Sequence, residues 1–122
     1  YFNYIYVRMG AYTLIHKRTE DDIWKNLFEL PLVETEKDLS EEEFLACPQF
    51  HALFAEGEVR MVRTLLRGVK HVLSHRVIYT NFYEVTLPDN SSSFSSYQRV
   101  AVEDLGRYAV PRLIHAFLEK YV

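Results

Sequence analysis

The sequence predicts an α+β fold, a mixed β-sheet sandwiched between helices. Three observations predict it. Aromatic and β-branched residues dominate several short segments, as is typical of β-strands. The segment 76–87 carries apolar residues at both alternating positions, which indicates a sheet covered on both faces. Two further segments, near 41–56 and 111–121, repeat apolar residues at helical spacing.

Length and composition predict one domain over residues 1–122. Of these 122 residues, 48% are hydrophobic and 15% aromatic, which suffices for a packed core. The single cysteine, Cys47, excludes an intrachain disulfide and fits a reducing compartment. No run approaches the ~20 apolar residues of a membrane span, so we expect no membrane partner. Because the chain opens on a strand-like Tyr1 without an initiator Met, we expect a longer parent protein.

The first part of the chain predicts three strands. Residues 1–8 and 11–17 surround a turn at Gly10, so we expect a β-hairpin. A third strand is predicted over 27–33, although Pro31 must lie at an edge or a bulge. Trp24 precedes this strand. We interpret it as a core or loop anchor, and stacking on a nucleic-acid base is the alternative.

The acidic Ser40-Glu41-Glu42-Glu43 segment predicts a helix start. Ser40 and Glu43 have the spacing of a capping box. The apolar stripe that follows is interrupted by Pro48, so two short helices or one kinked helix are expected over 41–56. The three glutamates suggest acid catalysis or a divalent-cation site, but acids in a first turn also complement the helix dipole.

The last third of the chain predicts a short strand and a final helix. A polar loop over 88–93 leads to a strand near 97–102 and a single helical turn near 103–108. Pro111 then begins a helix over 111–121, at a position where its missing N–H costs nothing.

The centre of the chain predicts two strands, 69–73 and 76–87, separated by a short break at Ser74-His75. This break places a hydroxyl and an imidazole directly before the guanidinium of Arg76. A plain turn has the same composition, because serine is a common turn residue. The alternative is a recognition loop that the two strands hold in place.

The charge pattern also singles out this region, although the net charge is −3. Residues 19–58 hold twelve of the seventeen acids, whereas residues 59–76 hold no acid. Two solvated faces of opposite sign would explain this pattern, and so would a local patch that faces phosphates. The candidates for phosphate contact are Arg67, Lys70, His71 and Arg76.

Motifs of metal and phosphate chemistry are absent from the sequence. It has no Gly-rich phosphate loop, no His-Glu-x-x-His helix and no Cys-x-x-Cys pair. Among five dispersed histidines, only His71 and His75 are close together, and no carboxylate stands beside them. We therefore expect no metal site.

Several motifs in the same order carry a family resemblance. They are Ile23-Trp24-x-x-Leu27-x-Glu29-x-Pro31, a helix, Lys70-His71-x-Leu73-Ser74-His75, and the segment from Leu105 to Pro111. With them, nearly the whole chain resembles the C-terminal domain of bacterial A/G-specific adenine DNA glycosylases, the MutY family. That domain is Nudix-like and related to MutT. The resemblance implies a domain that recognises 8-oxoguanine in DNA during base excision repair.

The most specific motif is His71-x-Leu73-Ser74-His75. It is similar to the family's His-x-Phe-Ser-His, whose Phe-Ser-His part reads 8-oxoguanine opposite adenine. The resemblance implies that Ser74 contacts the base and His75 lies beside the DNA, with Leu73 in place of the family's Phe. It also implies two partners: double-stranded DNA with 8-oxoguanine·A or G·A mispairs, and the N-terminal catalytic domain of the same protein.

The resemblance also bears on enzymatic activity. Active Nudix hydrolases carry a Gly-x5-Glu-x7-Arg-Glu-x-x-Glu-Glu box whose glutamates hold magnesium, and the stretch from Glu34 to Glu56 lacks it. We therefore expect this fragment to bind without hydrolysing and to need no cofactor. Adenine removal, and a 4Fe–4S cluster, would belong to the catalytic domain of a cytoplasmic bacterial enzyme. A divergent Nudix nucleotide pyrophosphatase and a protein-interaction domain are the alternatives.

Overall fold

A computed structural model describes residues 1–19, 24–72, 76–94 and 96–121. The element order is β1 (Phe2–Arg8), β2 (Tyr12–Lys17), β3 (Phe28–Glu29), β4 (Leu32–Glu34), α1 (Glu41–Ala46), α2 (Pro48–His51), β5 (Met61–Val72), β6 (Val77–Thr86), β7 (Gln98–Ala101), the 3-10 helix η1 (Val102–Arg107) and α3 (Arg112–Tyr121). The strands form a four-stranded sheet, β4-β1-β6-β5, and a three-stranded sheet, β3-β2-β7. Because β1 runs parallel to β6 and antiparallel to β4, the larger sheet is mixed.

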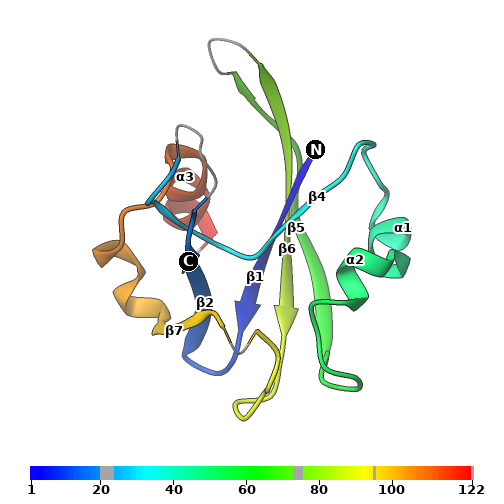
Figure 1. Cartoon of the computed structure of the whole chain (residues 1–122), viewed down its shortest axis with the longest axis vertical. Helices are drawn as coiled ribbons and strands as arrows, with labels where there is room; N and C mark the ends of the chain where they lie inside the picture. Colours follow the sequence, from blue (N-terminus) through cyan, green and yellow to red (C-terminus); the bar gives the residue numbers. More distant parts are fainter. Residues whose placement is uncertain (20–23, 73–75, 95, 122) are drawn as a thin grey trace.

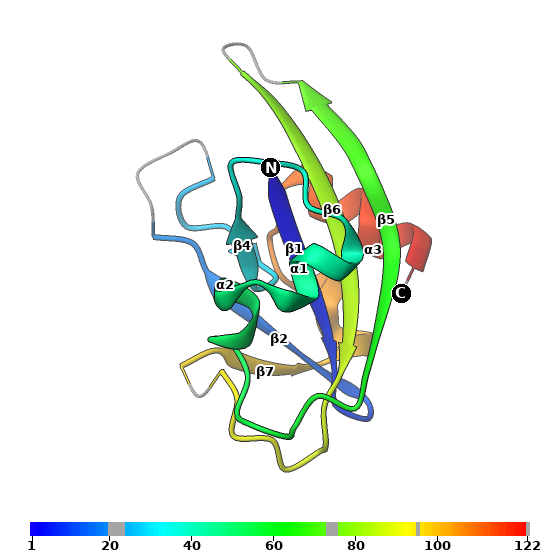
Figure 2. The same ribbon diagram turned by 90° about the vertical axis from the view of Figure 1, so that its right-hand side faces the viewer.

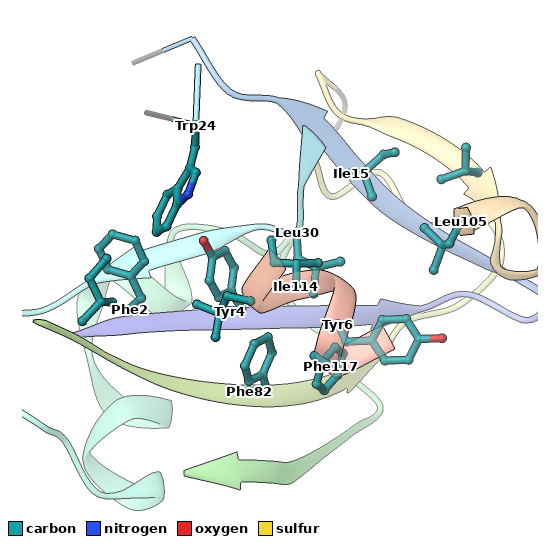
Figure 3. Close-up of a cluster of buried hydrophobic side chains, with 13 residues drawn as sticks. Phe2, Tyr4, Tyr6, Ile15, Trp24, Leu30, Phe82, Leu105, Ile114 and Phe117 are labelled. Carbon is teal, nitrogen blue, oxygen red and sulfur yellow. The ribbon is translucent and has the colours of Figure 1, made fainter. Parts of the chain in front are cut away.

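The larger sheet is covered on both faces, as its apolar pattern predicts. On one side, α3 and the smaller sheet pack against it, and the ring of Phe117 stacks on Phe82 at 4.2 Å (Figures 1 and 3). On the other side lie α1 and α2, and the ring of Phe44 stacks on Tyr83 at 4.5 Å. The α+β fold with a mixed sheet between helices is therefore confirmed.

The expected hairpin of residues 1–8 and 11–17 is reduced to its turn. Met9 and Tyr12 form an isolated bridge around Gly10, whose φ is 60°, and the two strands then enter different sheets. Instead of β2, β1 takes β6 as its parallel neighbour, from Phe2–Thr80 to Arg8–Thr86. The physical reason is burial, because nearly every residue of β1 is buried and belongs in the centre of a covered sheet.

The single strand predicted over 27–33 is also wrong. Two short strands replace it, since β3 pairs with β2 whereas β4 pairs with β1. Pro31 lies between them. It has no N–H to donate to a ladder, and its carbonyl accepts from the amide of Ile5 at 2.9 Å. Trp24 lies in the core, only 8% exposed, as expected of an anchor.

The helical predictions hold, except that the second helix ends at His51 and not near residue 56. Both bonds of the capping box are present: the Glu43 amide donates to Ser40 Oγ at 3.1 Å, and the Ser40 amide donates to Glu43 Oε1 at 2.9 Å. The chain makes two short helices, α1 and α2, with Pro48 beginning the second. The carbonyl of Pro111 accepts the bond from His115 that opens α3.

The strand β5 is longer than predicted, beginning at Met61 where the sequence indicated residue 69. Its pairing with β6 shifts register on either side of Leu66, and Gly68 has φ of 66°. This irregularity is a β-bulge, which bends a strand and increases its twist. The far ends of β5 and β6 project beyond the rest of the sheet (Figures 1 and 2). None of the helices described is long and apolar enough to cross a membrane.

Candidate functional site

The recognition residues implied by the resemblance, Leu73, Ser74 and His75, lie outside the described residues. The structure describes the strands that lead into them, β5 up to Val72 and β6 from Val77. The β5–β6 hairpin, whose strands flank these three residues in the sequence, is therefore the candidate site.

A buried amide network holds the bulge of this hairpin. The amide of Gly68 donates to Oδ1 of Asn81 at 2.8 Å, and Nδ2 of Asn81 donates to Oδ1 of Asn3 at 3.0 Å. Asn3 in turn donates to the carbonyl of Val33 at 3.1 Å. Asn3 and Asn81 are both buried, whereas Gly68 is exposed, and the network links β5, β6, β1 and β4. The bulge of β5 is thus tied to the centre of the sheet.

Arg67 supports the same bulge from the side of α1. Its NH1 donates to the Tyr83 hydroxyl at 2.8 Å, and its NH2 donates to Asp38 Oδ1 at 3.1 Å and to the Leu39 carbonyl at 2.8 Å. Burial raises the pKa of the Tyr83 hydroxyl, and the nearby Arg67 guanidinium acts in the lowering direction. Both terminal nitrogens of Arg67 thus bind groups of the protein, and contact of Arg67 with phosphates stays a prediction.

The other three candidates for phosphate contact lie on opposite sides of the hairpin. Lys70 is exposed and pairs with Tyr79. Because neighbouring residues of a strand point to opposite faces, His71 lies on the other side, where its ring is 6.3 Å from that of Trp24. Arg76 is exposed, and its guanidinium carbon lies 5.8 Å from the ring centroid of Phe2. The structure thus brings these cations to one end of the molecule without merging them into one patch.

An exposed apolar strip lies beside Lys70 and was not predicted from the sequence. Tyr79 stacks on Tyr1 at 5.6 Å, and both rings remain partly exposed. Val72 and Val77, which pair with each other, are also exposed. Apolar residues in a strand ordinarily indicate burial, so the sequence contained no signal that this part of the sheet has no cover.

A second polar cluster lies between the two sheets, around the buried carboxylate of Glu29. NH1 of Arg18 binds both its oxygens, at 2.9 and 3.1 Å, and Nε2 of His16 lies 3.3 Å from Oε2. The Tyr4 hydroxyl donates to Oε1 at 3.2 Å, and burial followed by the Glu29 charge raises the pKa of Tyr4. A pocket of about 230 Å³ adjoins this cluster, lined by His16, Arg18, Glu29, Leu32, Glu34 and Tyr97.

Two further carboxylates are held by hydrogen bonds. Glu43 closes the capping box, and the backbone amide and hydroxyl of Ser40 lower its pKa. Glu58 accepts from the hydroxyls of Ser91 and Ser93, both at 2.6 Å, and these bonds lower its pKa to about 2. Within the described ranges, no three His, Cys, Asp or Glu side chains gather in a way that could hold a metal ion.

Comparison with curated proteins finds no match to this chain. A family model described as a NUDIX domain matches residues 3–120, nearly the full length. This match agrees with the observed mixed sheet between helices and with the Nudix-like fold that the resemblance implies. The chain therefore belongs to the NUDIX domain family.

Proposed function

We propose that this NUDIX domain binds double-stranded DNA and recognises 8-oxoguanine opposite adenine, as the recognition domain of an adenine DNA glycosylase. The observation that carries the proposal is the β5–β6 hairpin. It projects beyond the sheet (Figure 2), and its bulge is held by the buried Asn81. In the sequence, Ser74 falls between its two strands.

The shape of the hairpin supports contact with a duplex. A two-stranded β-ribbon fits the major groove of B-form DNA, where base edges are accessible. Lys70 on one face of the ribbon and Arg76 near its end are exposed, and residues 69–83 contain no acid. Cations on both sides of a ribbon can contact the phosphates on both sides of a groove, which positions a protein without reading sequence.

The chemistry of the lesion supports a serine as the reader. Guanine presents N7 as an acceptor in the major groove. Oxidation at C8 turns N7 into an N–H donor and adds a carbonyl oxygen, so the edge then offers a donor and an acceptor. The hydroxyl of Ser74 can donate once and accept twice, and its backbone amide is a further donor. One residue can therefore complement both groups of the oxidised edge.

The catalytic domain of the parent protein would remove the adenine. The NUDIX domain would supply the preference for the lesion. The carboxylates of Glu43 and Glu58 already accept hydrogen bonds from groups of the protein. This supports a role in binding over a role in metal-dependent hydrolysis. The partners of the domain are then mispaired DNA and that catalytic domain.

The test compares duplexes that differ only in the oxidised guanine. Ser74→Ala should reduce the difference in binding free energy between the 8-oxoguanine·A and G·A duplexes by about 1 kcal/mol, the size of one net hydrogen bond. Because the backbone amide survives in this variant, a Ser74→Ala/His75→Ala double variant is the sharper measurement. Ser96→Ala, a change at an exposed serine of another loop, is the control. A double variant that separates the mispairs as well as the wild type does would refute the role of Ser74 and His75.

A divergent NUDIX pyrophosphatase is the second candidate. The pocket beside Arg18 and Glu29 favours it, because a polar, partly enclosed site between two sheets has room for part of a nucleotide. Release of phosphate or pyrophosphate from nucleotides with magnesium or manganese would support this function. A protein-interaction domain, in contrast, would show neither hydrolysis nor sensitivity to DNA lesions.

A further inference from the structure

One face of the hairpin end has no cover. The residues on this face follow from the strand register, in which Lys70 pairs with Tyr79 and Val72 pairs with Val77. Tyr1 joins them through its stack on Tyr79. We call these five residues, Lys70, Val72, Val77, Tyr79 and Tyr1, the open face.

The opposite side of the same two strands is packed. Ile78 is buried in the core, and His71 lies against Trp24. On the side of the open face, cover begins further along β6, where Phe44 of α1 stacks on Tyr83. The helices α1 and α2 lie against the lower part of the sheet and leave the hairpin end bare (Figures 1 and 2). The open face is thus an uncovered continuation of a buried sheet surface.

The open face is both apolar and basic. Val72 is 65% exposed and Val77 44%, so two paired valines at the end of the hairpin have no cover. Lys70 lies beside Tyr79, and the nearest acid along β6 is Glu84. Asp38, which contacts Asn81 further along the same side, is already paired with Arg67. Exposed apolar surface next to a cation indicates a partner that combines negative charge with apolar surface.

A second copy of the chain does not fit this pattern. In a symmetric dimer the same patch occurs on both sides of the interface. Two open faces would bring Lys70 toward its own equivalent, with no carboxylate from residues 69–83 to compensate. A DNA strand has the complementary composition, because its phosphates neutralise cations and its deoxyribose rings offer apolar surface.

We propose that the open face is a contact surface for the sugar–phosphate backbone of one DNA strand. Val72 and Val77 pack on deoxyribose rings, and Lys70 and the hydroxyls of Tyr79 and Tyr1 donate to phosphates. This inference rests on the proposed function, which brings the hairpin to DNA, and adds the side of the hairpin on which the backbone lies. The contact is independent of sequence and of the lesion, and thus differs from the role of Ser74.

The chain offers a matched pair of variants to test this surface. Val72→Glu and Met61→Glu make the same change in charge at the two ends of β5, at residues 65% and 59% exposed. A carboxylate against the phosphate backbone is a like-charge contact, so Val72→Glu should weaken binding by about tenfold or more. The loss should be equal for undamaged and 8-oxoguanine duplexes. Met61→Glu should stay within about twofold of the wild type, since only long-range charge acts there.

A second measurement tests the phosphate contact of Lys70. The slope of log K against log salt should become shallower by about one for Lys70→Gln, the value for one lost phosphate contact. Arg63→Gln is the control, because Arg63 lies on the same strand and bridges to Glu84. Melting curves of all four variants, followed by the fluorescence of the single tryptophan, Trp24, would show whether each remains folded.

The outcomes separate this inference from the proposed function. Equal effects of Val72→Glu and Met61→Glu, or an unchanged salt slope for Lys70→Gln, would overturn the open face as a DNA contact. A concentration-dependent dimer that Val72→Glu abolishes would overturn it too and assign the face to a second copy. If Val72→Glu weakens binding to all duplexes while the Ser74/His75 variant keeps its discrimination, the contact stands and only lesion recognition fails.

Discussion

Asn81 links the bulge of β5 to Asn3 of β1, so we expect Asn81→Ala to destabilise the domain and loosen the hairpin. The side chain is 1% exposed and makes two bonds inside the protein, one from the Gly68 amide and one to Asn3 Oδ1. A third, longer contact of 3.3 Å reaches Asp38. Alanine fills none of these roles.

The expected magnitude follows from the groups that lose their partners. A buried polar group without a partner costs about 1–3 kcal/mol. The Gly68 amide is partly accessible, so its cost lies near the lower end of this range. Asn3 Oδ1 is buried, so its cost is higher. Together they give a loss of about 3 kcal/mol in the free energy of unfolding. For a domain of this size, that is a fall in melting temperature of roughly 10 °C.

The measurement is urea unfolding followed by the fluorescence of Trp24, with amide exchange of residues 64–72 as a local readout. Thr80→Val is the matched control. Thr80 precedes Asn81 on β6 and is equally buried, but its hydroxyl has no partner among the described residues. Replacing that unpaired hydroxyl with a methyl group removes a buried polar group without a partner and leaves no new one, so stability should not fall.

The prediction also has a functional side. If Asn81 fixes the direction of the hairpin, Asn81→Ala should reduce lesion discrimination even at temperatures where the domain is fully folded. A loss of stability under about 1 kcal/mol for Asn81→Ala, or a comparable loss for Thr80→Val, would refute the reasoning from unpaired groups. Full stability loss with unchanged exchange at the bulge would show that the network stabilises the domain without fixing the hairpin.

Two further predictions concern charged side chains, and a third concerns hydrolysis. The pKa of Glu58, about 2 compared with an ordinary value of 4.5, means that its bonds to Ser91 and Ser93 stabilise the fold above about pH 4.5 and are lost as the pH falls toward 2. The stability difference between the wild type and Glu58→Gln should therefore shrink over that interval in acid unfolding curves. Arg18→Met should cost about 3–5 kcal/mol because it leaves the Glu29 carboxylate buried without its main partner, and Arg18→Met/Glu29→Leu should recover most of that loss in the same urea assay. The purified chain should release no phosphate or pyrophosphate from 8-oxo-dGTP or ADP-ribose with magnesium or manganese, and turnover above a blank would transfer the assignment to the pyrophosphatase.

Local signals predicted the elements of the fold well. The capping box at Ser40, the interruption at Pro48 and the start of α3 after Pro111 each depend on neighbours within four residues. The two-sided burial of β6 was equally legible, because strand alternation is a local pattern. The neighbour of each strand in the sheet could not be predicted from the sequence. Phe2 pairs with Thr80 across most of the chain, and no local feature distinguishes that parallel neighbour from the adjacent β2.

The candidate site shows the same division. That Lys70 and His71 lie on opposite faces follows from strand alternation alone, and the sequence analysis could have separated them. The role of Arg67 could not be predicted, because its partners Asp38, Leu39 and Tyr83 come from other elements. The early start of β5 was hidden as well, since the bulge at Gly68 breaks the alternation that marks a strand.

The segment 38–43 connects these observations. In NUDIX hydrolases, by the resemblance, the corresponding region supplies glutamates to magnesium. In this chain Asp38 accepts from both Arg67 and Asn81, and Glu43 caps the helix that carries Phe44 against Tyr83. Asp38 and Glu43 thus brace β5, β6 and α1. A domain that recognises a lesion needs a firmly held projecting element more than it needs free carboxylates, because its discrimination depends on where a hydroxyl is held. Under the proposed function, the contacts of Asp38 meet that need at the foot of the hairpin.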